Sequence, residues 1–472
     1  MDNQAIMGFN ELRQALDAVW LPGGEKGFSR VAVDSRQVKQ GSLFVCLKGE
    51  RQDGHNYIES AFKSGASGIM TARSRTEDPD SGIASLAARY NGNVIIVEDT
   101  LKGLQNAAAR YLEKFPKLVK VGITGSAGKS TTKEIAAALV GREKNTVINS
   151  GNLNSETGMP VSAFNVRPFH ELGIFEMGMN RRGEITELAE VLKPQLALIT
   201  NIGSAHIGIL GTKRAIAEEK KNIFAFFRGT EKAFIPADDE YCDFLARGLK
   251  GNVEYYSAGS LKDLEGVRDM GLFGTEIRWA GKPCVFHLPG AFNLANAIAA
   301  LAIAVELGIS GEGIRQGLES VRPLFGRGEI ISGPMTVIRD CYNSNPESLK
   351  AAVDFCDSLD WPGRRVYIIG SMLELGDASE DAHRKAGRLL ASSLAEKVFL
   401  YGAETETTAA VLASRLFPFY HTASMEDLED ELENYLRPGD LVLLKASRGC
   451  ALERLSGVLL GEKERSPAGG VY

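Results

Sequence analysis

Residues 122–134, GITGSAGKSTTKE, combine the residue types that hold a phosphate group. Glycines let backbone N–H groups approach a phosphate closely, and a helix that starts after them adds unpaired N–H donors and the positive end of its dipole. Lys129 can reach the β- and γ-phosphates, and the Ser130 hydroxyl can bind Mg²⁺. The usual loop has a glycine at position 123, but here the glycines fall at 122, 125 and 128. The segment therefore predicts a nucleoside triphosphate site built on a variant P-loop.

A carboxylate at the end of a neighbouring strand would complete a metal site beside this loop. Glu176 ends the apolar run in LGIFEMG and is the candidate. A GTPase would also need an N-K-x-D motif to read the guanine base, and the sequence contains none. The pattern therefore disfavours a GTPase switch.

These residues can act only if a strand and a helix flank the loop. LVKVGIT is an apolar run typical of a buried strand, and TTKEIAAALV has the composition of a helix. Further apolar runs, LGIFEMG, LALITNIG and KAFIPADD, alternate with helical stretches, which predicts a doubly wound, mostly parallel sheet. Residues 290–308 form the clearest predicted helix, with Gly308 as its stop. We therefore expect a central P-loop-type domain over residues 113–321.

Two further α/β domains are expected beside it. Residues 1–112 contain short apolar runs, RVAVDSR, GSLFVCLKG and NVIIVED, separated by turn residues, which predicts a small N-terminal α/β domain. Residues 322–472 repeat the strand–helix alternation with RVYIIGSM, KVFLYG and DLVLLKAS, which predicts a C-terminal Rossmann-like α/β domain. The 472 residues suit three domains of about 150 residues each.

Composition limits the function classes. Apolar residues make up 44% and charged residues 24%, as in ordinary globular proteins. The net charge of −6 disfavours a general binder of nucleic acid or anionic membranes. No apolar run approaches the roughly 20 residues that a membrane helix needs. An acidic protein that handles anionic ligands must concentrate its positive charge locally.

The cellular location follows from the N-terminus and the cysteines. The N-terminus, MDNQAIMGFNELRQ, lacks the basic and apolar regions of a signal peptide. The six cysteines show no C-x-x-C spacing, which gives little support to zinc or dithiol chemistry. We expect a monomeric cytoplasmic protein with reduced thiols.

The spacing G-x-x-G-x-x-G-K-[ST]-T resembles that of the Mur ligase family, and the resemblance covers nearly the whole chain. AVDSRQVKQGSLFVCLKGERQDGHNY is similar to the uridine-nucleotide domain of the branch that adds D-alanyl-D-alanine. GNLNSETGMP, FEMGMNRRGEI, ITNIGSAHIGILGT and EEKKNIF match its central domain in order. LPGAFNLANAIAA, GRGE, DCYNSNPESLKAA, IGSMLELGDASEDAH and KASRG match the later motifs. The D-N-P-R motif of the branch acting one step earlier is absent.

This resemblance implies an ATP-dependent ligase that joins D-alanyl-D-alanine to UDP-N-acetylmuramoyl-tripeptide through an acyl phosphate, in peptidoglycan synthesis. It implies ATP and two Mg²⁺ ions as cofactors. Lys220 takes the position of a lysine that the family carries as a carbamate, an oxyanion that can bridge or orient metal. On a helix Lys220 would face the metals, and its neighbour Lys221 would be solvated.

The resemblance also implies roles for individual residues. Arg327 would reach the γ-phosphate, Asp340 the ribose, and Asn293 and Asn296 the adenine. The implied ATP-binding residues are Gly125, Ser126, Ala127, Gly128, Lys129, Ser130, Thr131, Asn152, Asn293, Asn296, Arg327 and Asp340. The implied metal ligands are Ser130, Glu176, His206 and Lys220. The implied catalytic residues are Lys129, Glu176, His206, Lys220 and Arg327. The implied uridine diphosphate site comprises Ser35, Arg36, Lys48, Gly49, Asp53, Gly54 and His55.

Two alternatives remain open from the sequence. One is another ATP-dependent carboxylate–amine ligase, either another Mur ligase or a folylpolyglutamate synthase-like enzyme, which would begin directly at the P-loop domain. The other is a nucleotide-regulated binding protein that performs no ligation. The sequence does not distinguish diaminopimelate from lysine as the third residue of the peptide.

Overall fold

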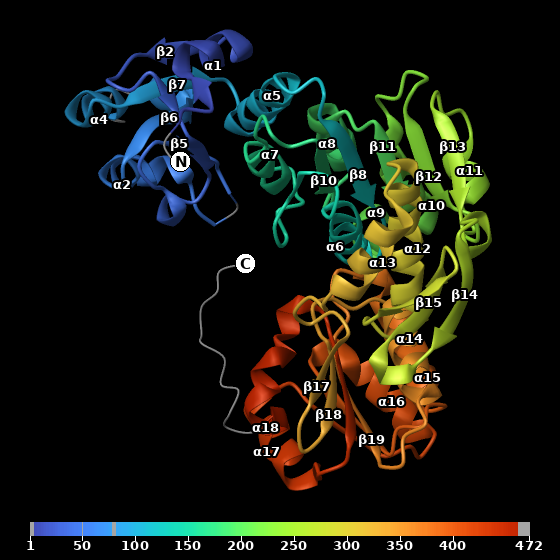
Figure 1. Cartoon of the computed structure of the whole chain (residues 1–472). Helices are drawn as coiled ribbons and strands as arrows, with labels where there is room; N and C mark the ends of the chain where they lie inside the picture. The colour runs from blue at the N-terminus through green and yellow to red at the C-terminus, as the bar shows by residue number, and fades with distance from the viewer. Residues whose placement is uncertain (1–3, 50, 78–81, 461–472) are drawn as a thin grey trace.

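The structure, a computed structural model, describes residues 4–49, 51–77 and 82–460. Figure 1 shows three bodies along the chain: a blue N-terminal body, a central body from teal to yellow, and an orange to red C-terminal body. The central body contacts each of the other two. None of the described helices is long and apolar enough to cross a membrane.

The N-terminal body is built on a five-stranded sheet in the order β2-β7-β6-β5-β4. Only β2 runs antiparallel to its neighbour. Its strands are β2 (Val19–Leu21), β4 (Arg30–Ala32), β5 (Ser42–Val45), β6 (Ala66–Ala72) and β7 (Asn93–Val97), and β1 (Met7–Gly8) pairs separately with β3 (Gly27–Phe28). The helices are α1 (Phe9–Leu16), α2 (Ile58–Lys63), α3 (Arg73–Thr76), α4 (Ile83–Tyr90) and α5 (Thr100–Glu113).

The central body holds a six-stranded sheet whose order, β13-β12-β11-β8-β10-β9, is parallel throughout. Its strands are β8 (Val119–Thr124), β9 (Thr146–Ile148), β10 (Leu172–Glu176), β11 (Leu196–Ile199), β12 (Lys232–Pro236) and β13 (Asn252–Tyr256). Its helices are α6 (Lys129–Val140), α7 (Gly158–Ala163), α8 (Glu184–Leu192), α9 (Ile207–Leu210), α10 (Lys213–Lys221), α11 (Cys242–Ala246), α12 (Ala291–Glu306) and α13 (Gly311–Ser320).

Helices cover both faces of this central sheet, which confirms the doubly wound prediction. One core forms where α6, α12 and α13 pack against the sheet, and another where α5, α7, α8 and α10 pack against its other face. Strands buried on both faces are apolar at successive positions, as the sequence of β11, LALI, illustrates. The predicted helix over residues 290–308 is α12, and Gly308 follows it with φ of 70°.

Helix α5 joins the N-terminal body to the central one. Its residues Leu104 and Ala107 belong to the core that also contains Met159 of α7 and Leu188 of α8. The Tyr111 hydroxyl donates to the carbonyl of Val166 at 2.7 Å. The predicted boundary between residues 112 and 113 falls at the end of this helix and stays a prediction, as does the boundary between residues 321 and 322.

The C-terminal body contains a second doubly wound sheet, in the order β17-β18-β22-β19-β20-β21, in which only β17 is antiparallel. Its strands are β17 (Glu329–Ser332), β18 (Thr336–Asp340), β19 (Arg365–Gly370), β20 (Lys397–Tyr401), β21 (Phe419–Thr422) and β22 (Leu441–Lys445). Its helices are α14 (Pro346–Ser358), α15 (Ser379–Leu390), α16 (Glu406–Ser414), α17 (Met425–Tyr435) and α18 (Ser456–Leu460). The predicted Rossmann-like fold is confirmed.

A three-stranded antiparallel sheet was not predicted. It comprises β14 (Leu264–Asp269), β15 (Thr275–Trp279) and β16 (Lys282–Phe286). Trp279, Ile277 and Phe286 are buried in the core beside α12 and α13, whereas most of β14 is exposed.

Candidate active site

The glycine-rich loop lies between β8 and α6, as predicted, and close packing explains two of its glycines. Gly125 has φ of 152°, and a Cβ there would lie 1.8 Å from the Thr200 hydroxyl oxygen. Gly128 has φ of 79°, and a Cβ there would lie 2.1 Å from Oδ1 of Asn296. A side chain at either position would therefore displace a neighbour that lines the cleft.

The residues that follow β11 hold this loop in place. Ser126 donates its N–H to the Asn201 carbonyl at 3.0 Å, and its hydroxyl accepts from the Gly203 N–H at 2.8 Å. The Asn201 side chain accepts from the Ala127 N–H at 3.0 Å, and the Thr200 hydroxyl donates to the Ala127 carbonyl at 2.6 Å. Parallel strands β8 and β11 thus place the loop at the carboxyl edge of the sheet, where ligands bind in such folds.

Ser130 and Glu176 meet at the base of the loop. The Ser130 hydroxyl donates to Oε2 of Glu176 at 2.5 Å, and the Asn154 amide donates to its Oε1 at 2.6 Å. Asn149 fixes the end of β10, because its side chain accepts from the Glu176 N–H at 2.8 Å and donates to the Glu176 carbonyl at 3.0 Å. The buried Lys133 ammonium donates in turn to the Asn149 carbonyl.

The donor set at this point suits Mg²⁺. Mg²⁺ prefers oxygen ligands and is commonly held by one or two carboxylates together with substrate phosphates. Ser130 and Glu176 supply a hydroxyl and a carboxylate, both buried and directed at each other. Within the described residues no three His, Cys, Asp or Glu side chains gather as a metal cage. The Ser130 and Glu176 oxygens suit an ion held jointly with nucleotide phosphates.

Lys220, near the end of α10, is buried, with the residue only 1% exposed. Burial, and then the positive charge of Lys129, hold the pKa of Lys220 well below its ordinary value. The neighbouring Glu219 anchors this part of α10, because its carboxylate accepts from the N–H groups of Gly183 at 2.9 Å and Ile185 at 3.0 Å, at the start of α8. Lys220 is therefore held in surroundings that favour its neutral amine.

The prediction that Lys221 is solvated is wrong. Lys221 is partly buried, and its ammonium donates to the carbonyls of Phe244 at 2.8 Å and Arg247 at 2.5 Å. The cation is drawn to these carbonyls because they are exposed at the end of the short helix α11. Lys221 thus points away from Lys220, and Lys129 is the cation that contributes to the lowered pKa of Lys220.

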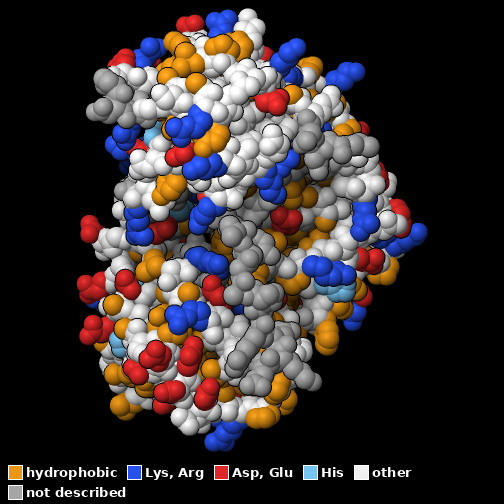
Figure 2. Space-filling model, turned by 90° about the vertical axis from the view of Figure 1, so that its left-hand side faces the viewer, with side chains coloured by type: hydrophobic (Ala, Val, Ile, Leu, Met, Phe, Trp, Pro, Cys, Tyr) orange, Lys and Arg blue, Asp and Glu red, His pale blue; other side chains and the backbone are white. Residues whose placement is uncertain are grey.

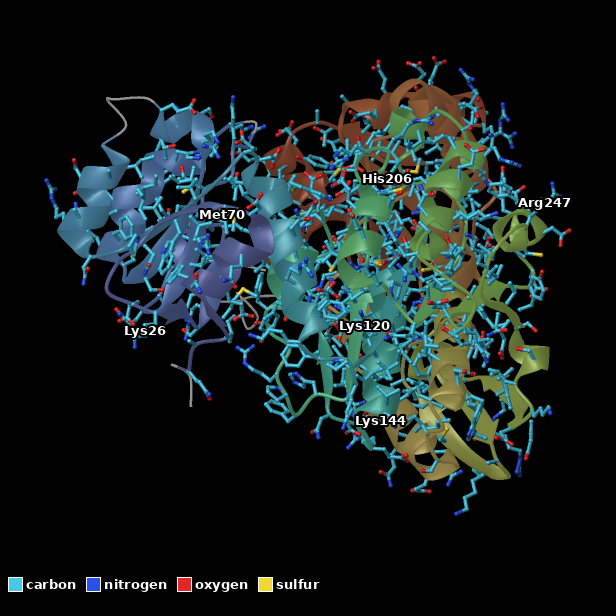
Figure 3. All side chains as sticks on the ribbon, turned by 90° about the horizontal axis from the view of Figure 1, so that it is seen from above. Lys26, Met70, Lys120, Lys144, His206 and Arg247 are labelled. Carbon is cyan, nitrogen blue, oxygen red and sulfur yellow. The ribbon has the colours of Figure 1, made fainter. Side chains whose placement is uncertain are left out.

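His206 lies at the border between the central and C-terminal bodies (Figure 3). It immediately precedes α9 and has φ of 66°, the left-handed conformation that residues with a Cβ rarely adopt. Its Nδ1 lies 3.3 Å from Oε2 of Glu374 in the C-terminal body. The His206 imidazole lowers the pKa of the Glu374 carboxyl.

The C-terminal body contributes Arg327 and Asp340 to the same cleft. Arg327 lies over the Tyr342 ring, 3.9 Å from its centre, which holds the guanidinium in place. Asp340 ends β18 and receives a hydrogen bond at 2.7 Å from Lys445, which ends the adjacent strand β22. Burial raises the pKa of Asp340, and the Lys445 charge opposes that rise.

The predicted adenine residues lie on the first turns of α12. Asn293 is 1% exposed and donates to the Pro289 carbonyl at 2.8 Å, which fixes its orientation. Asn296 packs against the loop and lies 3.4 Å from the Thr132 hydroxyl. Asn152 lies across the cleft on the exposed loop that follows β9.

A single cleft of about 890 Å³ unites these groups. Its walls include the following predicted residues: Ser126, Ala127, Gly128, Lys129, Ser130, Thr131, Asn152, Glu176, His206, Asn293, Asn296, Arg327 and Asp340. Gly125 and Lys220 do not line it, because both residues are buried.

The predicted uridine residues form a separate group in the N-terminal body. Asp53 accepts from the His55 N–H at 3.0 Å and from His55 Nδ1 at 2.6 Å, and it pairs with Arg75. Burial raises the pKa of Asp53, but the bonds from His55 and Arg75 outweigh it and lower this pKa to about 2. His55 Nε2 accepts from the Ala72 N–H at 3.2 Å, so both ring nitrogens of this residue have partners that hold the imidazole in place.

Short turns hold the remainder of this group. The Gly54 N–H donates to the Leu47 carbonyl at 2.7 Å, and the Gly49 N–H donates to the Gln52 carbonyl at 2.8 Å. These bonds pair Lys48 with Asp53 in an antiparallel bridge. Ser35 and Arg36 lie on a separate turn capped by Asp34, and the Arg36 side chain is 85% exposed.

On the face drawn in Figure 2, many Lys and Arg side chains lie across the middle of the molecule, whereas many Asp and Glu side chains lie on its lower part.

The structure adds residues that the sequence reasoning missed. These supporting residues are Lys133, Asn149, Asn154, Glu219, Glu374 and Lys445. Five of them stood inside sequence motifs described above, GITGSAGKSTTKE, GNLNSETGMP, EEKKNIF, IGSMLELGDASEDAH and KASRG. Their partners are distant in the chain or belong to the backbone, so the motifs alone did not reveal their contacts.

Comparisons with known proteins agree with this arrangement. Three family models match the chain: "Mur ligase family, catalytic domain" over residues 28–115, "Mur ligase middle domain" over residues 123–304, and "Mur ligase, glutamate ligase domain" over residues 326–448. A Treponema pallidum protein, UDP-N-acetylmuramoyl-tripeptide–D-alanyl-D-alanine ligase, is 41% identical over 463 residues, covering 97% of this chain and 100% of that protein.

Solved structures give the same result. A crystal structure of MurF from Acinetobacter baumannii has a TM-score of 0.86 at 27% identity, covering 97% of this chain and 99% of that one. MurF from Thermotoga maritima in complex with ADP has a TM-score of 0.75 at 27% identity, covering 91% and 96% respectively.

Proposed function

Because this chain belongs to the Mur ligase family, we propose that it is the ligase that joins D-alanyl-D-alanine to UDP-N-acetylmuramoyl-tripeptide. The reaction consumes ATP, forms a C–N bond and releases ADP and phosphate, giving the pentapeptide precursor of peptidoglycan. The observation that carries the proposal is the cleft in which the loop of the central body faces Arg327 and Asp340 of the C-terminal body. The near full-length relationship to ligases of this name supports the choice of substrates.

The chemistry explains why such a cleft is needed. A carboxylate resists attack by an amine, because its charge repels the nucleophile and oxide is a very poor leaving group. Transfer of the ATP γ-phosphate to the tripeptide carboxylate gives an acyl phosphate. The D-alanyl-D-alanine amine then attacks the acyl carbon, and phosphate leaves from the tetrahedral intermediate. The acyl phosphate hydrolyses readily, so closure of the cleft must exclude water.

Two cations of this chain oppose the repulsion between the carboxylate and the γ-phosphate. Lys129 would follow the phosphate during transfer, and its ammonium now donates to the Gly125 carbonyl at 2.9 Å. Arg327 would approach from the C-terminal body, held by the Tyr342 ring. Fixed positive groups act most strongly on the charge that develops during transfer.

The metal ligands are part of the proposal. Ser130 and Glu176 would hold one Mg²⁺ ion, and His206 would help to hold a second. These ions would neutralise phosphate charge as the two anions meet. Lys220 would bind CO₂ through its neutral amine, losing one proton as the N–C bond forms, and the resulting carbamate would orient the metal.

The N-terminal group would hold the uridine diphosphate part of the substrate. Asp53 and His55 fix each other and the turn that contains Gly54, while Lys48 and Arg36 supply positive charge for the diphosphate. Gly49 lies on the turn of Lys48, and Ser35 lies on the turn of Arg36. We propose that the protein is monomeric. We also propose that it is cytoplasmic, and the six free thiols support this location.

Phosphate release tests the function directly. We expect purified protein with ATP and Mg²⁺ to release phosphate only when both UDP-N-acetylmuramoyl-tripeptide and D-alanyl-D-alanine are present, with one new peptide bond per phosphate. Equal release without either substrate would support a nucleotide-regulated binding protein and reject the ligase. Comparing tripeptides that end in diaminopimelate and in lysine would identify the preferred third residue.

A further inference from the structure

One contact between the central and C-terminal bodies joins two residues in unusual conformations. His206 and Glu374 are far apart in the chain, and both have a positive φ, of 66° and 65° respectively. Each therefore carries a side chain in the left-handed region, where a Cβ is strained. Their side chains face each other, with His206 Nδ1 3.3 Å from Glu374 Oε2. Strain of this kind persists where the surrounding structure imposes it, and it gathers at functional sites.

Stability does not explain the pair. The Glu374 side chain is 59% exposed, and exposed ion pairs contribute little to folding. The His206 side chain is 14% exposed, and its Nδ1 makes no hydrogen bond of good geometry with any described residue. Glu374 is thus the carboxylate placed beside a buried ring nitrogen that otherwise lacks a partner.

The backbone next to the pair fixes the distance between the two bodies. The Gly208 N–H donates to the Glu374 carbonyl at 3.3 Å. A Cβ on Gly208 would lie 2.4 Å from the Gly376 nitrogen, and a Cβ on Gly376 would lie 2.7 Å from the Gly208 Cα. Helix α9 and the turn that contains Gly376 therefore touch through their main chains, and this contact sets where the Glu374 carboxylate lies relative to the imidazole.

We propose that Glu374 is a positioning residue that the C-terminal body supplies to the metal site of the central body. Its carboxylate holds the Nδ1–H of His206, so that Nε2 is the nitrogen presented to the cleft. When the non-ligating ring N–H of a metal-binding histidine donates to a carboxylate, this bond orients the ring and makes the ligating nitrogen more basic. The inference rests on the proposed function, because it assigns His206 to the site that binds metal with ATP. It adds that the site is complete only when the two bodies are in contact.

Binding of Mn²⁺ in the presence of a non-hydrolysable ATP analogue tests this without any turnover. We expect Glu374→Ala to weaken Mn²⁺ binding by about tenfold or more, measured by electron paramagnetic resonance titration. Glu374→Gln should stay within about threefold of the parent, because its amide oxygen can still accept from Nδ1–H. Asp377→Ala, on the same exposed turn, is the matched control and should leave the affinity unchanged.

A double substitution decides whether Glu374 acts through His206. In a His206→Ala background, Glu374→Ala should weaken Mn²⁺ binding no further. An additive loss would overturn the proposal, and so would parent-like affinity in Glu374→Ala. Circular dichroism would verify folding, and Glu374→Ser replaces the alanine variant if that variant misfolds. Substrate-dependent phosphate release by the parent protein tests the proposed function separately, so either idea can fail alone.

Discussion

The lysine of the phosphate loop is the residue on which the strongest prediction depends. Lys129 is the single cation in the loop sequence GSAGKST, and its partner becomes more anionic during transfer. We expect Lys129→Ala to lower kcat by about 10²–10³-fold or more, with an unchanged melting temperature. Lys117→Ala, at an exposed site before β8, is the control. Normal turnover in Lys129→Ala would reject the P-loop assignment.

Lys220 and Lys221 form a natural comparison, because they are adjacent but point to different surroundings. We expect Lys220→Ala to lose activity by about 100-fold or more, since the metal site loses an oxyanion. Formate or acetate should restore part of it by occupying the vacated position. Lys221→Ala should stay active, because its ammonium bonds the carbonyls of Phe244 and Arg247, away from the cleft.

Two outcomes of that comparison would change the assignment. An inactive Lys221→Ala beside a fully active Lys220→Ala would mean that the wrong lysine was aligned. If neither substitution mattered, the carbamate would be wrong for this chain. Carbon-13 NMR of protein incubated with labelled bicarbonate offers an independent check, because a carbamate carbon gives its own signal.

At the residue scale, the sequence revealed groups whose chemistry is local. Lys129 and Ser130 are recognisable because their loop is one continuous segment. Glu374 is not, because an exposed glutamate in a loop is ordinary until the fold places His206 beside it. Lys445 is similar: its role depends on the register that sets it opposite Asp340 in the neighbouring strand.

At the scale of elements, helix α10 is fixed because its Glu219 caps the start of helix α8. Glu219 accepts from the Gly183 and Ile185 N–H groups, which have no partner within α8. We expect Glu219→Ala to lower the stability of the central body by about 1–2 kcal/mol, seen as a lower urea midpoint. It should also reduce activity, because Lys220 is the next residue.

The adjacent Glu218 provides the control for that experiment. Its carboxylate pairs with Arg214 at 3.0 Å on the exposed face of the same helix. Such a pair contributes about 0.3–0.5 kcal/mol, so Glu218→Ala should shift the midpoint far less. Equal effects of the two substitutions would contradict the capping role of Glu219.

Elements were predictable where burial made their pattern strong. Strands β10 and β11 are apolar on both faces, and α12 is alanine-rich because it packs closely on α6. The sheet β14–β15–β16 was missed because β14, LEGVRD, is mostly exposed and polar. Such strands are defined by pairing with their neighbours, which a single sequence does not display.

At the scale of the whole molecule, the cleft exists because two bodies meet. We expect Gly208→Ala to force them apart, because its Cβ would lie 2.4 Å from the Gly376 nitrogen. A displacement of about 1 Å at the reacting groups can lower kcat by about 100-fold. Small-angle scattering with the ATP analogue should show a larger radius of gyration, while the melting temperature stays nearly constant.

Ile209→Ala is the matched control for this substitution, since the Ile209 side chain is 46% exposed on the same short helix. It should leave both the scattering curve and kcat unchanged. An unaltered radius of gyration and normal kcat in Gly208→Ala would show that the glycine contact does not set the distance between the bodies.

The contact between Gly208 and Gly376 also has an evolutionary consequence. Two glycines that meet through their main chains leave no side chain that could be adjusted in small steps. A substitution at one position is tolerable only if the other loop retreats, so neither can drift alone. Among descendants of this sequence, we expect the two positions to be inherited as a pair, and to change together or not at all.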